Sequence, residues 1–331
     1  MSSDHPVGLG IGPEIPPQLS LSWTQAAEAA GLDAVWFHEA IYSRDAAPVI
    51  AAAAAHTSHI ALGAGCFSAI ARHPAMLAMT AATLQELSGG RFLLGVGTGF
   101  PARLAQAHLL PNRLFSTFAE SVELVKRLLY GINEPYHGNT YHLEHLLSMP
   151  VPTPVPPLYI AGWKPKMLAL TATMADGYLA RPVESPKTMT RLVDHLHQHR
   201  QGAEDLHIAG YILCAFADTR PQARQMARED PFVVYQLSVM DDDVLLENGF
   251  DPQLKRIVSQ ALQRGDQKAA AAAVPDRWLD TFTACGTPAQ VADALWQWHQ
   301  AGLEMPVLQP IRADNQQAAA AIEAAQRYQH A

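Results

Sequence analysis

Glycines at every second position mark three short apolar runs, a spacing that could make room for a flat ligand. The run at 92–96 follows a Gly-Gly helix stop and is too short for a helix, so it is predicted to be a buried strand. Side chains alternate between the faces of a strand, so alternate glycines leave one face bare. Either a ligand or a crowded barrel interior would use that space. These glycines are Gly8, Gly10 and Gly12, then Gly63 and Gly65, then Gly95, Gly97 and Gly99.

Side chains that could move protons or bind anions directly follow other apolar runs. His38 is a candidate general acid, with a merely strand-terminal role as the alternative. Lys164 and Lys166 stand where a helix is predicted to begin, and they are either phosphate ligands or solvated surface lysines. Arg181 could bind an anionic group of a substrate, and Trp163 could form a wall of the pocket.

A repeated alternation of strand and helix would position these side chains. Eight such units predict an α/β protein of the (β/α)8 TIM-barrel class, whose site lies at the C-terminal ends of the strands. The predicted strands are 7–11, 33–37, 60–66, 92–96, 158–161, 177–180, 208–216 and 305–308. The first helix is expected to begin at a Ser20 or Ser22 cap and to end at Ala30. The other predicted helices are 48–56, 74–87, 114–130, 166–174, 186–199, 288–301 and 316–328.

Two segments depart from this alternation. Residues 131–157 are rich in proline and form an excursion, after which the alternation resumes at once. Residues 220–283 are polar and helical in pattern and are predicted to be an insertion after strand seven. The whole chain, 1–331, is therefore expected to be one barrel domain.

Composition narrows the class of function. The net charge of -8 and the pI near 6.0 argue against a nucleic-acid-binding protein. Cys66, Cys214 and Cys285 lie far apart, so neither a disulfide framework nor a zinc site is indicated, and no metal is expected. The first residues lack the pattern of a secretory signal, and the alanine tracts are too short to span a bilayer, so a cytoplasmic protein is expected.

Two other chemical interpretations fit less well. The glycines at 95, 97 and 99 with Glu120 could be a dinucleotide fingerprint, but the spacing is not G-x-G-x-x-G, and Glu120 falls within a predicted helix. His195 and His199 share a helix face, but no Glu accompanies them as in a His-Glu-x-x-His zinc motif, so a solvated helix is favoured.

Several motifs in combination resemble the luciferase-like flavin and deazaflavin oxidoreductases. Ser43-Arg-Asp45 and Lys164-Pro-Lys-Met167 are most similar to the branch typified by methylenetetrahydromethanopterin reductase, which uses coenzyme F420. The resemblance implies hydride transfer between deazaflavin C5 and a C=C, C=N or C=O bond, and a homodimer. The motifs that carry it lie at 33–39, 63–66, 73–77, 84–99, 161–168, 175–177 and 286–288.

The same resemblance implies particular site residues. It places a non-prolyl cis peptide at Gly65-Cys66, the acidic residue of strand two at Glu39, and the phosphate at 162–166, with Arg103 as a second candidate for the tail. The cofactor-binding residues it implies are Gly10, Glu39, Gly65, Cys66, Gly97, Thr98, Gly99, Arg103, Gly162, Trp163, Lys164, Pro165 and Lys166.

Both familiar proton donors of the family are absent. Ala40 stands where the family has histidine after its acidic residue, and Phe100 stands where sugar-phosphate dehydrogenases have glutamate. His38 and Glu39 therefore remain the catalytic candidates. A partly apolar substrate is expected, contacted by Ile41, Tyr42, Phe100 and Arg181. The alternatives are an FMN-dependent monooxygenase of the same family and a non-catalytic flavin-binding protein.

Overall fold

The computed structural model describes residues 5–132, 134–144, 150–200 and 205–331. Parallel strands, each followed by helix, make the chain a (β/α)8 barrel, as the sequence predicts. It divides into two compact units. The N-terminal unit comprises Gly10–Ala180 and His195–Ile208, and the C-terminal unit comprises Met1–Leu9, Arg181–Asp194 and Ala209–Ala331.

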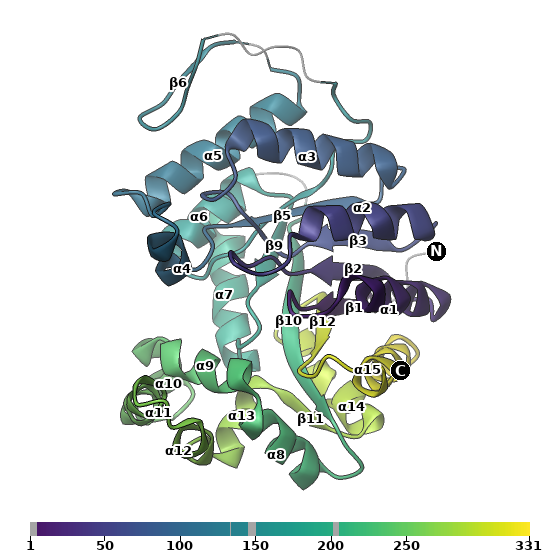
Figure 1. Ribbon diagram of the computed structural model, residues 1–331, viewed down its shortest axis with the longest axis vertical. Coiled ribbons are helices and arrows are strands. Elements are labelled where there is room, and N and C mark those ends of the chain that lie inside the picture. Colours follow the sequence, from purple (N-terminus) through teal and green to yellow (C-terminus); the bar gives the residue numbers. More distant parts are fainter. Residues whose placement is uncertain (1–4, 133, 145–149, 201–204) are drawn as a thin grey trace. The chain divides into compact units, whose positions relative to one another are not determined.

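The N-terminal unit holds a parallel sheet in the order β2-β3-β5-β8-β9, with β4 added beside β5. Helices α2 and α3 pack on β3 and β5 (Figure 1). The strands are β2 (Ala34–Phe37), β3 (Ala61–Ala64), β4 (Phe67–Ser68), β5 (Phe92–Gly97), β8 (Leu158–Ile160) and β9 (Gly177–Ala180). The helices are α1 (Pro17–Ala29), α2 (Ala46–His56), α3 (Pro74–Leu87), α4 (Pro101–Gln106), α5 (Leu114–Leu129) and α6 (Pro165–Met174), and α7 (Pro186–His199) follows β9.

The C-terminal unit contains strands paired in the order β11-β10-β12-β1. Thr287 and Gln290 form a reciprocal capping box at the start of α14. The strands are β1 (Gly8–Ile11), β10 (His207–Phe216), β11 (Ala284–Gly286) and β12 (Met305–Pro310), and the helices that follow β11 and β12 are α14 (Pro288–Gln300) and α15 (Asn315–Gln329).

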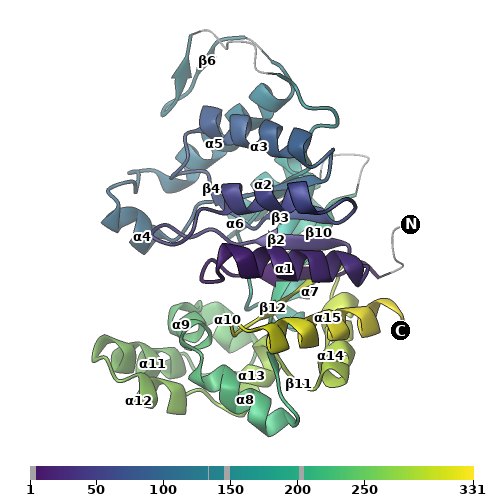
Figure 2. The same ribbon diagram turned by 45° about the vertical axis from the view of Figure 1, so that its right-hand side comes forward.

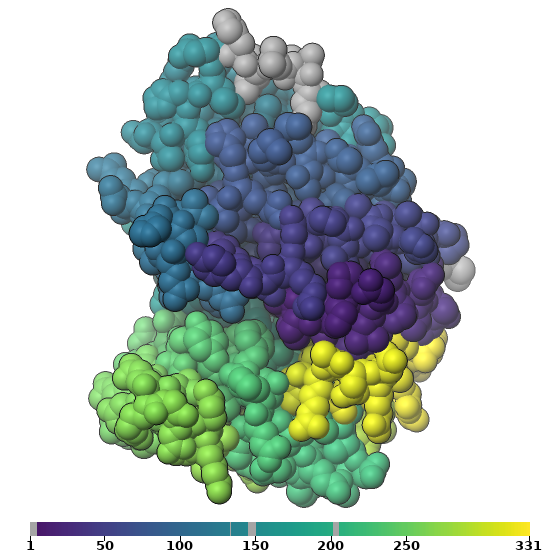
Figure 3. Space-filling model, viewed as in Figure 1, coloured from purple at the N-terminus to yellow at the C-terminus, as the bar shows by residue number. Residues whose placement is uncertain are grey.

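The segment between β10 and β11 is helical, as predicted for the insertion. Its helices bury a core that includes Trp278, Phe282 and Phe250 and that continues to Leu213 of β10 and Cys285 of β11. Helices α11 and α12 lie side by side (Figure 2) and are exposed in light green on the surface in Figure 3. The helices are α8 (Arg220–Glu229), α9 (Pro231–Val239), α10 (Asp242–Glu247), α11 (Gln253–Gln263), α12 (Gln267–Ala272) and α13 (Asp276–Phe282).

Two buried aromatic rings explain Gly63, one of the alternating glycines, and also Gly177. Trp36 is fully buried, and a Cβ added at Gly63 would lie 2.3 Å from its indole ring. The Tyr159 ring meets Trp36 edge-on at 5.1 Å and comes within 2.2 Å of a Cβ added at Gly177. Protein atoms therefore fill this space, and the prediction that the bare faces leave room for a ligand is wrong at Gly63. Crowding in the barrel, the alternative interpretation, accounts for these glycines.

Arg91, in the Gly-Gly-Arg motif, fastens the turn between α2 and β3. Its guanidinium donates to the backbone oxygens of Ser88 (2.7 Å), Ile60 (2.7 Å), Thr57 (3.0 Å) and Ala54 (3.2 Å). The carboxylate of Glu28 accepts three backbone N–H bonds from residues 58 to 60 in the same turn. A planar donor with five N–H groups suits this cluster of carbonyls, so Arg91 has a structural role.

Some local elements differ from the predictions. Helix α1 begins at Pro17, because proline is well suited to the first helical position; Ser20 lies inside it, and its hydroxyl donates to Pro16 O (3.1 Å). The sequence reasoning missed β4, α4, β11 and an antiparallel hairpin of β6 (Tyr136–His137) and β7 (His142–Leu143). Within the predicted excursion, residue 133 and residues 145–149 lie outside the described residues.

Gly95→Ala tests the crowding in the barrel. The new Cβ would lie 2.0 Å from the backbone oxygen of Ala64, and this atom belongs to a paired strand and cannot move away. We expect the free energy of unfolding in urea to fall by about 2 kcal/mol. Gly12→Ala is the matched control, because its new Cβ meets only the flexible carboxylate end of Glu14. Equal losses of unfolding free energy in the two variants would show that the close contact with the Ala64 oxygen is not the cause.

Candidate functional site

The C-terminal ends of β3, β4, β5 and β8 meet at one place in the N-terminal unit. Ser68 pairs with Gly97, and Val96 pairs with Ile160. A Cβ added at Gly97 would lie 2.6 Å from Cys66 Sγ and 3.6 Å from the Cβ of Ala161. The structure thus brings together three groups predicted to bind the cofactor: the 65–66 segment, the glycine at the end of β5, and the loop before α6.

The Gly65-Cys66 peptide bond is cis, as the family resemblance implies. Its position is fixed next to β2, because Gly65 N donates to Phe37 O (2.8 Å). Burial, followed by the nearby charge of Glu39, raises the pKa of the Cys66 thiol to about 12. The thiolate is the reactive form of cysteine, so the raised pKa favours the neutral, less reactive thiol at physiological pH.

Ser68 fixes the turn that follows β5, and sequence reasoning missed it. Its hydroxyl donates to Thr98 O (2.9 Å) and accepts from Ala71 N (3.1 Å). Gly99 has a φ of 79°, and a Cβ there would lie 2.8 Å from Ser68 Oγ. Glycine at this position is thus required both by the backbone conformation and by the close approach of the serine.

Glu39 is held by Arg72, a second residue that sequence reasoning missed. Arg72 Nε donates to Glu39 Oε1 (3.1 Å), and its Nη2 donates to Oε2. Nη2 also bonds Asp45 Oδ1 at 2.6 Å, and Asp45 in turn caps α2 by accepting from Ala47 N (3.0 Å). The hydrogen bond to Glu39 is the main cause that raises the pKa of Arg72. The Glu39 carboxylate is 12% exposed with both oxygens occupied, so it suits positioning better than proton donation.

The loop from β2 to α2 is fastened to its neighbours while its tip stays exposed. Ser43 Oγ and Arg44 Nη1 both donate to Pro13 O, and Arg44 also reaches Glu14 O at 2.7 Å. Tyr42 has a φ of 68° and is 71% exposed. The motif at 43–45 therefore holds the loop that carries two predicted substrate residues, Ile41 and Tyr42.

Arg103 lies against this same loop. Its Nη1 donates to Ile41 O at 3.1 Å, and its guanidinium stands 5.7 Å from the ring centre of Phe100. The structure thus joins three of the predicted residues, Arg103, Ile41 and Phe100, into one rim. Phe100 is 40% exposed and offers an apolar surface there.

His38 continues β2 beyond its last paired residue. Its backbone N–H donates to Ile11 O (2.9 Å), and the residue is half-buried. It lines a small pocket together with Ile11, Phe37, Arg44 and Asp45. Gly10, one residue before Ile11, is buried in β1.

The N-terminus of α6 offers donors for an anion. Lys164 is the cap residue, and its side chain makes no capping bond; Pro165 follows in the first turn. Lys164 Nζ lies 5.9 Å from the ring centre of Trp163, and Lys166 Nζ lies 5.9 Å from that of Phe115. First-turn N–H groups with adjacent lysines suit a phosphate. A Cβ added at Gly162 would meet the Met167 side chain at 2.7 Å, so this glycine allows the close turn.

Arg181, predicted to bind an anionic substrate group, is engaged by carboxylates within the C-terminal unit. Its Nε donates to Glu184 Oε1 at 2.5 Å, and its Nη2 stands 4.0 Å from Asp241 Oδ2. Its side chain is 16% exposed.

The structure shows the contacts of Glu120, from the dinucleotide interpretation, and of His195 and His199, from the zinc interpretation. Glu120 accepts backbone N–H bonds from residues 139 to 141 and so anchors the β6–β7 hairpin. Burial raises the pKa of Glu120, but these bonds outweigh it and lower the pKa below its ordinary value. The rings of His195 and His199 stack at 4.2 Å. Among the described residues, no three His, Cys, Asp or Glu side chains gather as a metal site.

A sequence profile described as luciferase-like monooxygenase matches residues 4–305, so the chain belongs to this family of oxidoreductases. Within the part of the chain that the structure describes, no helix has the length and apolar character needed to cross a membrane.

Individual proteins similar to the chain give more detail than the family profile. The chain is 26% identical over 285 residues to 5,10-methylenetetrahydromethanopterin reductase of Methanolobus tindarius, covering 85% of this chain and 86% of that protein. It is 27% identical to a putative coenzyme F420-dependent oxidoreductase of Mycobacterium tuberculosis, over 91% of this chain and 93% of that protein. The structure of the F420-dependent tetrahydromethanopterin reductase of Methanopyrus kandleri has a TM-score of 0.86 and 22% identity, covering 98% of each chain.

Arg72→Gln tests the ion pair at the end of β2. We expect it to lower the free energy of unfolding by about 3 kcal/mol, because Glu39 would keep a largely buried charge without its partner. The double variant with Glu39→Gln should recover part of that loss, since no unpaired charge remains. Urea unfolding of the single and double variants provides the cycle. If the two losses simply add, the residues are not coupled.

Gly97→Ala tests the contact between β5 and the 65–66 segment. We expect a loss of about 1 to 3 kcal/mol in unfolding free energy, because the new Cβ would lie too close to the Cys66 sulfur. Adding Cys66→Ala removes that sulfur, so the double variant should be more stable than Gly97→Ala alone. Thermal and urea unfolding both report this. A double variant no more stable than the single one would place the clash elsewhere.

Proposed function

We propose that the protein is an F420-dependent oxidoreductase that transfers a hydride between deazaflavin C5 and a C=C, C=N or C=O bond of a small, partly apolar substrate. The observation that carries this is the meeting of Cys66, Gly97 and Ala161 beside the α6 N-terminus. Both relatives described above carry F420 or tetrahydromethanopterin chemistry in their names, which supports the choice of cofactor.

The residues present fit such a cofactor. The backbone of Gly97, Thr98 and Gly99 would lie along the ring and its chain, and the first-turn N–H groups of α6 with Lys164 and Lys166 would hold the phosphate. Bound there, the deazaflavin supplies two-electron hydride chemistry, while the protein supplies orientation and exclusion of water.

The proton that accompanies reduction is proposed to pass through His38. Glu39 is held at both oxygens by Arg72 and acts as a positioning residue. His38 lies next to it and lines a pocket, and its imidazole is the kind of side chain that most often acts as a general acid or base. On the substrate side, Ile41, Tyr42 and Phe100 present exposed or partly exposed apolar groups around the Arg103 rim, which favours a partly apolar molecule.

The proposal includes a homodimer in the cytoplasm. Helix α3 carries three exposed apolar side chains. Met76 is 57% exposed, Met79 is 50% exposed and Leu87 is 56% exposed. An exposed apolar stripe of this kind is typical of a protein interface. Cys66, Cys214 and Cys285 are free thiols, which suits a reducing compartment.

A second candidate is an FMN-dependent monooxygenase. The family profile itself is described as luciferase-like monooxygenase. In this case the same site would hold FMN, and the apolar rim would keep water from the reacting group.

Equilibrium titrations of the purified protein with F420 and with FMN, followed by fluorescence, separate the two. We expect tighter binding of F420. Replacing Lys164 and Lys166 together with alanine should weaken F420 binding about tenfold, because each lysine contributes charge-assisted contacts. Lys268→Ala, at an exposed position on α12, is the matched control. Preferential binding of FMN, with oxygen consumption by the reduced flavin, would shift the assignment to the monooxygenase.

A further inference from the structure

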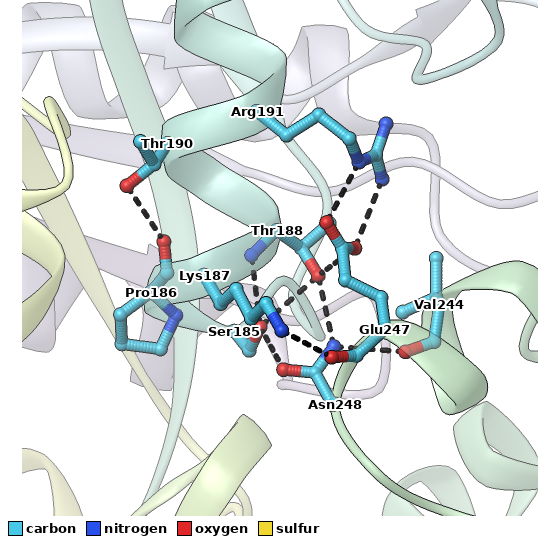
Figure 4. Close-up of polar contacts among 9 residues, drawn as sticks. All are labelled: Ser185, Pro186, Lys187, Thr188, Thr190, Arg191, Val244, Glu247 and Asn248. Atoms are coloured by element: carbon cyan, nitrogen blue, oxygen red, sulfur yellow. Dashed lines mark hydrogen bonds and ion pairs between the residues drawn. The ribbon is translucent and has the colours of Figure 1, made fainter.

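Helix α10 of the insertion is fastened at its C-terminal end to the first turns of α7 (Figure 4). Ser185 Oγ donates to Asn248 Oδ1 (2.7 Å), and Thr188 Oγ1 donates to Glu247 Oε2 (3.0 Å). Arg191 Nε donates to Glu247 Oε1 at 2.9 Å. A hydrogen bond between neutral side chains, a hydrogen bond to a carboxylate and an ion pair thus act together. We call these contacts the α7–α10 clamp.

The N-terminal end of α10 meets the segment between β9 and α7 at a different place. Asp241 is the cap residue of α10, and its Oδ2 stands 4.0 Å from Arg181 Nη2. Arg181 Nε donates at 2.5 Å to Glu184, three residues further along its own segment. One guanidinium therefore faces two carboxylates, one from its own segment and one from the insertion.

Glu184 differs from Asp241 in its surroundings. Its side chain is 1% exposed, whereas that of Asp241 is 28% exposed. Among the described residues, Glu184 Oε2 has no hydrogen-bond partner. Its backbone oxygen accepts from Trp298 Nε1 on α14 (2.7 Å), which fixes the residue against that helix. An ionised carboxylate with one bare oxygen in such a place is costly, and a neutral carboxyl costs much less.

The ionisation of Glu184 decides which group balances the charge of Arg181. The charged groups that act on Glu184 are Arg181 on its own segment, Arg191 on α7 and Asp241 at the start of α10. With Glu184 neutral, Asp241 is the counter-ion nearest to Arg181, and the insertion is held at both ends of α10. With Glu184 ionised, Arg181 is neutralised within its own segment, and the attraction for Asp241 falls.

We propose that Glu184 is a proton-operated switch that controls how firmly α10 of the insertion is docked on the β9–α7 segment, by releasing or retaining Arg181 for Asp241. The switch does not depend on the cofactor or substrate.

The direction of its pH dependence follows from linkage. Burial raises the pKa of Glu184 above its ordinary value of 4.5, and the charge of Arg181 only partly opposes this. The docked state therefore binds the proton more tightly than an undocked state in which Glu184 meets water. The contribution of Glu184 to docking is full at pH below that ordinary value and is lost as the pH rises through the raised pKa.

Hydrogen–deuterium exchange of the full-length protein, read on the peptide spanning 242–248, tests this. Protection factors corrected for intrinsic exchange should fall as the pH rises, by at most about tenfold per pH unit for one proton. Glu184→Gln keeps a neutral side chain of the same shape, so its protection should stay high and independent of pH. Glu86→Gln, at an exposed position on α3, is the matched control and should behave like the wild type.

Protection that does not change with pH in the wild type, or the same pH dependence in Glu184→Gln, would overturn the proposal. Infrared difference spectroscopy of the wild type needs no substitution and covers the case in which the variant fails to fold. A carboxylic acid C=O band that titrates together with the loss of protection supports the switch. If no such band remains at pH values above the ordinary pKa of 4.5, the proposal is overturned.

Discussion

The packing of Trp36 across the sheet is the constraint on which the N-terminal unit depends. A fully buried indole needs room that only glycine gives on the neighbouring strand at Gly63, and it rests edge-on against Tyr159 of β8. Tyr159 in turn needs Gly177 on β9. Aromatic rings and glycines thus alternate around this part of the barrel, so that each strand is matched to the next.

This layer also determines where a site can form. Below it the sheet interior is filled by side chains, and above it the backbones after β3, β4, β5 and β8 converge around Cys66, Gly97 and Ala161. Ser68 and Arg72 hold the two loops next to that place through bonds to Thr98 O and Glu39. Membership of the family indicates an oxidoreductase. The contacts made by Ser68 and Arg72 set the local conformation of the two loops.

The barrel could be predicted from the sequence because its strands are apolar runs bounded by glycine, proline and polar residues. Helices α3 and α7 and strand β9 begin and end where the sequence indicates. The sequence could not decide between a ligand and crowding at Gly63, because the ring that fills its space belongs to another strand. Arg72 was missed for the same reason: it lies 33 residues from Glu39, and no local pattern joins the two. The β6–β7 hairpin was missed because its turn is held by a carboxylate from α5.

That carboxylate has a consequence for how the hairpin can vary. Glu120 accepts the main-chain N–H groups of residues 139–141. Side chains of the same turn also contact α5, because Asn139 bonds the Glu120 carboxylate and Thr140 Oγ1 lies 3.3 Å from Thr117 Oγ1. Proline alone lacks the required donor. The turn therefore tolerates a grafted epitope or labelling tag only where both the main-chain donors and the side-chain contacts to α5 are kept.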